Sequence, residues 1–177
     1  YIYRGGSPIA RLFSGYYYNG NAPSFPGGQN IGLAEGPGSI RVLATDDPAA
    51  GAEIAAQAVP ANALWKLLSL NIQMVQGATQ TPRPALRLRN AGGTVLVEIP
   101  AAAQQSASTT VDYSWALGMG RDISDANGLV QSMPLPDISL LEAFDFITVT
   151  AGIGANSNYG VGTYVVEEWL LDTTSIV

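Results

Sequence analysis

The chain has 177 residues, a length that fits one domain, and carries 8 Lys and Arg against 14 Asp and Glu, a formal net charge of −6 at pH 7. This acidic balance argues against binding to nucleic acid, and no stretch is apolar over the ~18 residues that a membrane-spanning helix needs. Charged residues make up only 12% of the chain and hydrophobic residues 47%, so we expect much of its surface to be covered by partner proteins.

Residues 1–39 are predicted to form an extended arm. Gly and Pro interrupt this stretch too often for a long helix or strand, yet aromatic and aliphatic residues are scattered through it. We expect such a segment to be ordered by lying on a surface, which is either its own domain or a neighbouring subunit. Three consecutive tyrosines cannot all face one core, so at least one should meet solvent or a partner. The residues predicted to anchor the arm on a partner are Leu12, Phe13, Tyr16, Tyr17, Tyr18 and Phe25.

Residues 40–177 are predicted to form a β-domain of about eight strands, because short strand-forming runs alternate with turn signals every ten residues or so. The run 53–59 is the weakest of them, and the prolines in and after 129–135 make that run a short edge strand. Residues 61–70 are the one place where a helix competes with a strand. The runs from which these strands are drawn cover 40–44, 53–59, 68–74, 86–89, 95–99, 108–117, 129–135, 145–151 and 163–171.

Alternating hydrophobicity predicts which side chains these strands bury. From Leu68 to Met74 every second residue is apolar, so these apolar side chains should face the core and the polar ones solvent. The run 86–89 repeats the pattern with its leucines inward, and a solvated sheet face explains its arginines better than a nucleic-acid site does. Asn90 to Gly93 supplies the backbone freedom for a hairpin turn. No crossover helices are evident, so the predicted class is all-β: an antiparallel β-sandwich, jelly-roll-like, with an extended N-terminal arm.

The sequence contains no His and no Cys, which removes the commonest general base, the usual catalytic triads and most zinc and iron–sulfur sites. Glu167 and Glu168 are adjacent on a predicted strand, so they lie on opposite faces and cannot act as a pair unless a bulge intervenes. One of them is expected to be buried beside Tyr164 or Trp169. The chain is therefore predicted not to be an enzyme, with no catalytic residue, cofactor or metal.

Two other possible sites in the sequence have plainer explanations. Asp122, Asp125, Asn127 and Gly128 could hold calcium, but they lack the spacing of an EF-hand loop and such loops are usually turns. Aromatic side chains could also form a platform for a sugar, with the loops 118–128 and 152–162 beside it, although core packing is the plainer role for those on strands. The aromatic residues in question are Tyr16, Tyr17, Tyr18, Trp65, Tyr113, Trp115, Tyr159, Tyr164 and Trp169.

One stretch, from about Val59 to Trp169, resembles small β-sandwich structural proteins of tailed bacteriophages, which are usually encoded among the virion genes. The resemblance rests on hydrophobic, turn and packing positions, and the arm is not part of it. The segments that carry it are Leu64–Leu70, Arg83–Arg89, Gly93–Leu96, Ile99–Ala101, Gln104–Ser108, Pro134–Pro136 and Val165–Trp169.

The resemblance implies a virion component: a capsid cement or decoration protein, or an accessory piece of the neck or tail. It implies no catalytic residue. The expected partners are other virion proteins, such as the major capsid protein, and sister subunits in a homo-oligomer; no nucleic acid and no membrane are expected. The alternative is a receptor- or carbohydrate-recognition module of a tail or head fibre, and a glycosidase fragment is the remotest possibility. The arm distinguishes them, because a sugar binder or an enzyme has no need of one.

Overall fold

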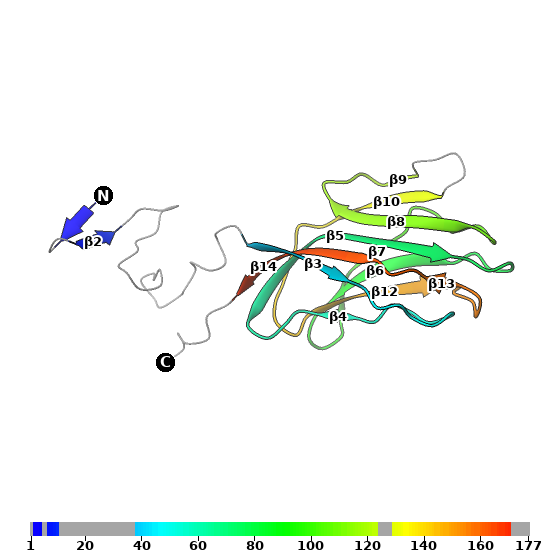
Figure 1. Ribbon diagram of the computed structural model, residues 1–177, viewed down its shortest axis with the longest axis horizontal. Coiled ribbons are helices and arrows are strands. Elements are labelled where there is room, and N and C mark those ends of the chain that lie inside the picture. The colour runs from blue at the N-terminus through cyan, green and yellow to red at the C-terminus, as the bar shows by residue number, and fades with distance from the viewer. Residues whose placement is uncertain (1, 5–6, 11–37, 124–128, 171–177) are drawn as a thin grey trace.

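The computed structural model describes residues 2–4, 7–10, 38–123 and 129–170 of the chain. These residues form fourteen β-strands, and among them no helix is long and apolar enough to cross a membrane. The predicted all-β sandwich is confirmed, since the strands build two packed sheets that run along the long axis of the domain (Figure 1).

The larger sheet has eight strands. Its order is β3 (Ser39–Ala44), β14 (Thr163–Leu170), β5 (Ala63–Val75), β8 (Thr110–Leu117), β10 (Val130–Leu135) and β9 (Asp122–Ile123), while β11 (Ser139–Leu140) and β13 (Asn158–Tyr159) pair with β5. The smaller sheet has the order β4 (Gln57–Ala58), β12 (Asp145–Ala151), β6 (Arg83–Arg89) and β7 (Val95–Pro100). The remaining two strands, β1 (Ile2–Arg4) and β2 (Ser7–Ala10), pair with each other.

Eight of these strands form four nested antiparallel pairs. The first of the eight pairs with the last (β3 with β14), the second with the seventh (β4 with β12), the third with the sixth (β5 with β8) and the fourth with the fifth (β6 with β7). This nesting is a long hairpin rolled into two sheets, which is the jelly-roll topology. The jelly-roll-like prediction is therefore confirmed for the sandwich.

One strand pair departs from the predicted antiparallel arrangement. β10 lies parallel to β8, with Val130 opposite Asp112 and Leu135 opposite Leu117. A parallel pair needs a connection that returns to the start of the first strand, and the residues between Leu117 and Val130 provide it. β10 is nearly an edge strand, as predicted, because only the two residues of β9 lie beyond it.

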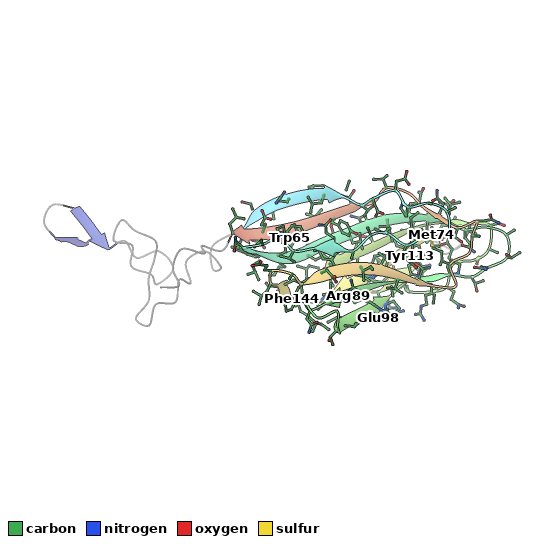
Figure 2. The ribbon with its side chains drawn as sticks, turned by 90° about the horizontal axis from the view of Figure 1, so that it is seen from below. Trp65, Met74, Arg89, Glu98, Tyr113 and Phe144 are labelled. Atoms are coloured by element: carbon green, nitrogen blue, oxygen red, sulfur yellow. The ribbon has the colours of Figure 1, made fainter. Side chains whose placement is uncertain are left out.

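The core lies between the two sheets and is rich in aromatic side chains. Trp65 and Tyr164 both pack against Phe146, with Phe146 edge-on to Tyr164 at a ring-centroid distance of 4.9 Å. Tyr113 stacks on Trp115 at 5.9 Å. Figure 2 shows Trp65 and Met74 toward opposite ends of the sandwich, so the buried layer extends along all of β5.

The alternation predicted for β5 is correct for only part of the strand. Beyond Ser69 the even-numbered residues are buried, but before it Trp65 and Leu67 are buried instead. The change of phase comes from a β-bulge: Val165 of β14 lies opposite Ser69 and Val166 opposite Leu67, so Leu68 has no opposite residue. The prediction that Leu68 faces the core is therefore wrong, and Leu68 is half-buried. The ambiguous stretch 61–70 is strand from Ala63 onward.

Most of the weak strand predicted at 53–59 is also absent, since only Gln57 and Ala58 pair with β12. The backbone N–H of Ala55 instead donates to the carboxylate of Asp46 at 2.8 Å. The Asp46 side chain thus provides the hydrogen bond of this backbone N–H group, so the group does not need a neighbouring strand.

Candidate interaction surface

The predicted partner-binding residues of the arm lie outside the described residues. These are Leu12, Phe13, Tyr16, Tyr17, Tyr18 and Phe25. The structure therefore describes the surface of the sandwich, where a partner could also bind, but not these arm residues.

The outer face of the eight-stranded sheet carries few charges. Asn71 and Gln73 of β5 lie beside Ser114 and Asp112 of β8, and Ser114 donates to Asn71 Oδ1 at 2.7 Å. Gln73 Nε2 donates to Asp112 Oδ1 at 2.9 Å. These polar groups line a shallow depression of about 300 Å³ whose rim includes Val130 and Val161. Asp112 is the one charged residue among those that line the depression, and the other polar groups named here are neutral.

Aliphatic side chains lie exposed along one border of this outer face. Ile40 and Val42 of β3 are 59% and 67% exposed, and both lie on the outer face because Val42 is opposite Val165 of β14. The other side of β3 has no strand beside it among the described residues. This border, Ser39–Ala44, is called the β3 edge below.

A buried carboxylate fixes the β3 edge to the sandwich. Glu168 is only 8% exposed and accepts hydrogen bonds from Trp65 Nε1 at 2.6 Å and from Arg41 at 2.9 and 3.0 Å. Its neighbour Glu167 points to the outer face and accepts the backbone N–H of Gly38 at 2.8 Å. The prediction that the two glutamates lie on opposite faces is confirmed, and the buried one contacts Trp65. Glu168 thus holds a side chain of β3, and Glu167 holds the backbone just before that strand begins.

Most of the other described carboxylates are also engaged in structural contacts. Glu53 accepts the backbone N–H of Thr150 at 2.7 Å, and burial raises the pKa of its carboxyl group, an effect that the two hydrogen bonds from Thr150 oppose. Asp145 is paired with Arg89, and Glu98 with Arg87, on the outer face of the smaller sheet (Figure 2). The arginines of 83–89 therefore bond within the domain and form no open basic stripe.

The structure bears on the two weaker sites as well. Among the described residues no three acidic or other metal-ligating side chains lie close enough to hold an ion. Three of the four residues of the possible calcium loop, Asp125, Asn127 and Gly128, lie outside the described residues. Trp65, Tyr113, Trp115, Tyr159 and Tyr164 are all at most 2% exposed, so these aromatic side chains belong to the core and offer no platform for a sugar.

The loop 152–162 packs closely against residues 76–80. The Ser157 hydroxyl bonds to Gln76, and Gln76 Nε2 donates to the Gln80 carbonyl at 2.9 Å. A methyl group on Gly154 would meet Gln80 Oε1 at 2.5 Å, so the two loops touch at that point, beside a small pocket of about 190 Å³ that both of them line. The two loops therefore bond to each other through polar groups and leave a small pocket between them.

The β3 edge was missed as a candidate site from the sequence. Its signal was present, since Ile40 and Val42 alternate with Arg41 in the first strand after the arm. What the sequence could not show is that β3 lies at the border of the sheet, because that depends on which strands pair.

No family model matches the sequence, and no curated protein matches it. Among solved structures, the chain is similar to a chain of infectious bursal disease virus, Gx strain, with a TM-score of 0.36 and 10% identity over 78% of this chain. It is also similar to a chain of the Gt strain of that virus, with a TM-score of 0.38 and 12% identity over 94% of this chain. The chain spans 38% and 39% of the length of those two chains.

Proposed function

We propose that the chain is a non-enzymatic structural protein of a virion, a capsid cement or decoration protein of a tailed bacteriophage. In this role it binds capsid or sister subunits through its arm and the outer face of its larger sheet. The observation that carries the proposal is the outer face itself, where exposed aliphatic side chains of β3 border a sheet whose central strands β14, β5 and β8 carry only Glu167, Lys66 and Asp112 as charged residues there. Surfaces that become buried in an assembly lack charge in this way.

The chemistry of the described residues supports a structural role. Glu168, Glu53 and Asp145 each bond to groups of neighbouring strands, so these carboxylates hold the sandwich together. The jelly roll is a fold of viral capsid domains and of lectins, so the fold alone does not choose between assembly and sugar binding. The burial of five candidate aromatic residues favours assembly.

The proposal is tested on particles purified from the source of the gene. Mass spectrometry should find the protein in particles banded on a density gradient, and antibody labelling in the electron microscope should place it on the head. Purified protein should then rebind to particles that lack it. If washed particles from a culture that makes the protein contain none of it, the proposal is wrong.

A variant of the full chain tests the role of the arm. Replacing Tyr16, Tyr17 and Tyr18 together with Ser should reduce the occupancy of particles, since each tyrosine contributes apolar area at about 25 cal/mol per Å². The matched control replaces Tyr1 and Tyr3, which are not among the predicted anchors, with Ser. If the triple variant occupies particles fully, the part of the proposal that assigns capsid binding to the arm is wrong.

A further inference from the structure

The β3 edge is an open strand edge of a kind that soluble proteins usually protect. Its six residues include no proline and no glycine, and its pairing with β14 is continuous from Ser39 to Ala44. Of these residues only Leu43 is not exposed. The single charged side chain, Arg41, points inward and is held by Glu168. An inward-pointing charge is one way to protect an edge, but the charge of Arg41 is balanced by Glu168, and the unpaired backbone groups of β3 remain a template for another strand.

The edge at β7 is protected in several ways. Leu96 is the extra residue of a β-bulge, since Leu88 lies opposite Val97 and Arg89 opposite Val95. Pro100 cannot donate a hydrogen bond, and the Ile99 carbonyl already accepts one from Trp115 Nε1 at 3.0 Å.

The other two borders are protected as well. The border of β12 pairs with only two residues of β4, and farther along the strand the Glu53 carboxylate takes the backbone N–H of Thr150. At the far border of the larger sheet, β9 covers only Gln131 and Ser132 of β10, and Pro134 in the rest of that strand has no N–H. Among the four borders of the described sandwich, the β3 edge is therefore the one that pairs without interruption over six residues and has neither a proline nor a β-bulge.

The backbone groups that β3 leaves free can be assigned. The N–H of Thr45, the residue after β3, donates to the Gly162 carbonyl at 3.0 Å and so faces the β14 side. In an antiparallel pair, successive residues direct their N–H and C=O groups to opposite sides. Those of Arg41 and Leu43 therefore face β14, while those of Ile40, Val42 and Ala44 face away from the sheet.

A second β3 strand fits this edge in one register. The outward backbone groups of two antiparallel copies meet when Val42 lies opposite Val42 of the second copy and Ile40 opposite Ala44. A shift by one residue would place the outer face of one sheet beside the inner face of the other. A shift by two residues in one direction would place Arg41 opposite Arg41 of the second copy, which is a repulsive pair, and in the other direction would leave only residues 42–44 of the strand paired. In the favoured register Arg41 lies opposite Leu43 and keeps its bond to Glu168.

We propose that two copies of this chain pair antiparallel through their β3 edges, with Val42 at the twofold axis. The two larger sheets then form one continuous sheet whose outer face is shared, and the aliphatic side chains of β3 pack across the axis. The interface is the same on both copies, as a twofold dimer requires. This inference deepens the proposed function by naming one sister-subunit contact, but it concerns the purified protein and does not depend on a particle.

The test measures self-association of the full chain by sedimentation velocity over a range of concentrations. The wild-type chain should form a dimer, and Val42→Lys should weaken it by at least about tenfold, because two ammonium groups would face each other at the axis. Val42→Glu should weaken it likewise. A mixture of the Val42→Lys and Val42→Glu variants should restore the dimer, since unlike charges then meet at the axis.

Val75→Lys is the matched control. Val75 is also an exposed aliphatic residue, 44% exposed, but it lies on β5, inside the sheet, so its replacement should leave the dimer unchanged. Fluorescence of the buried Trp65 and Trp115 checks that each variant is folded. If Val42→Lys does not fold, Ile40→Lys takes its place in the same measurement.

Three results would overturn the proposal: a wild-type chain that is monomeric at every concentration, a dimer that Val42→Lys leaves intact, or an equal loss in Val75→Lys. A chain that dimerises as described but does not bind particles would contradict the proposed function alone. A chain that decorates particles and stays monomeric in solution would contradict only the dimer.

Discussion

Two threonines of β12 that face the core differ in what their hydroxyl groups contact. Thr150 Oγ1 bonds to Glu53 at 3.1 Å and to the Tyr159 hydroxyl. Thr148 lies two residues earlier on the same face and is fully buried, yet its hydroxyl has no partner among the described residues. A buried hydroxyl without a hydrogen bond lowers stability, because it loses its bonds to water on folding.

Thr148→Val is therefore expected to raise the free energy of unfolding by about 1 kcal/mol, since the methyl group that replaces the hydroxyl has nearly the same volume and needs no partner. Thr150→Val is the control and should lower it by about 1–3 kcal/mol, because Glu53 and Tyr159 would lose their bonding partner. Urea denaturation of the two variants measures both changes. A destabilised Thr148→Val variant would mean that its hydroxyl has a partner in solution.

Tyr164 predicts how stability depends on pH. Burial raises the pKa of its hydroxyl from 10.0 to about 12 and the negative charge of Asp46 adds to this, so the group ionises at lower pH in the unfolded chain than in the folded one. The folded protein then holds the proton more tightly, and stability that is fully present below pH 10 is lost as the pH rises toward 12. Burial also raises the pKa of Tyr113 and Tyr159, so they contribute to the same loss.

Tyr164→Phe should reduce this alkaline loss of stability, by at most about 1.4 kcal/mol for each pH unit. The measurement compares denaturant unfolding of the variant and the wild type at neutral pH and at several values above pH 10. The difference between the two proteins should grow in favour of the variant as the pH rises. A constant difference would show that Tyr164 ionises at the same pH in both states.

At the scale of elements, alternating hydrophobicity predicts that a segment is a strand better than it predicts which face of that strand is buried. The even-numbered residues of β5 face the core only beyond the bulge, and the bulge exists because β14 pairs with both halves of β5 in different registers. Nothing local at Leu68 marks it, since leucine suits a bulge no better than a regular strand. In β12 the sequence also does not show which face is buried. Phe146, Thr148 and Thr150 are buried, while Ile147 and Val149 lie half-buried on the outer face.

The attachment of β3 leads to a prediction at this scale. Glu168 links three neighbouring strands, because it stands on β14 and accepts bonds from Arg41 on β3 and Trp65 on β5. Glu168→Gln should lower the free energy of unfolding by about 2 kcal/mol, since the amide brings an N–H group to face the existing donors.

The control for this variant is Glu98→Gln. Glu98 is bonded to Arg87 in an exposed pair, so its loss should cost about 0.5 kcal/mol or less. Thermal unfolding of both variants beside the wild type measures the difference. Equal effects would mean that burial adds nothing to the bonds of Glu168 and that β3 is held by its backbone alone.

At the scale of the whole molecule, strand spacing and turn residues were enough to predict a sandwich, because each strand has its own local signal in the sequence. The pairing of the strands was not predictable in this way. β3 and β14 lie at opposite ends of the domain sequence, and only the β6–β7 hairpin joined by Asn90–Gly93 has a local signal. The candidate site shares this limit, since the exposure of Ile40 and Val42 follows from the position of β3 at a border. The predicted arm anchors remain predictions.

The division of the chain into an arm and a sandwich at residue 39 leads to a final prediction. Among the described residues, those of the buried core all lie between Ile54 and Val166, and β1 and β2 pair with each other and with no strand of the sandwich. A chain that begins at Gly38, and so keeps the bond from Gly38 to Glu167, should unfold with a free energy within about 1 kcal/mol of the full chain, because every core residue that the structure describes is retained. Urea denaturation of both chains measures this difference, and sedimentation shows whether the shorter chain still dimerises through Val42. A loss of several kcal/mol would mean that the arm packs on its own domain, which would leave its tyrosines unavailable to a capsid. An unchanged free energy together with lost particle binding would mean that the arm is reserved for a partner, and the β3 edge and the arm would then be two separate contacts of one assembly protein.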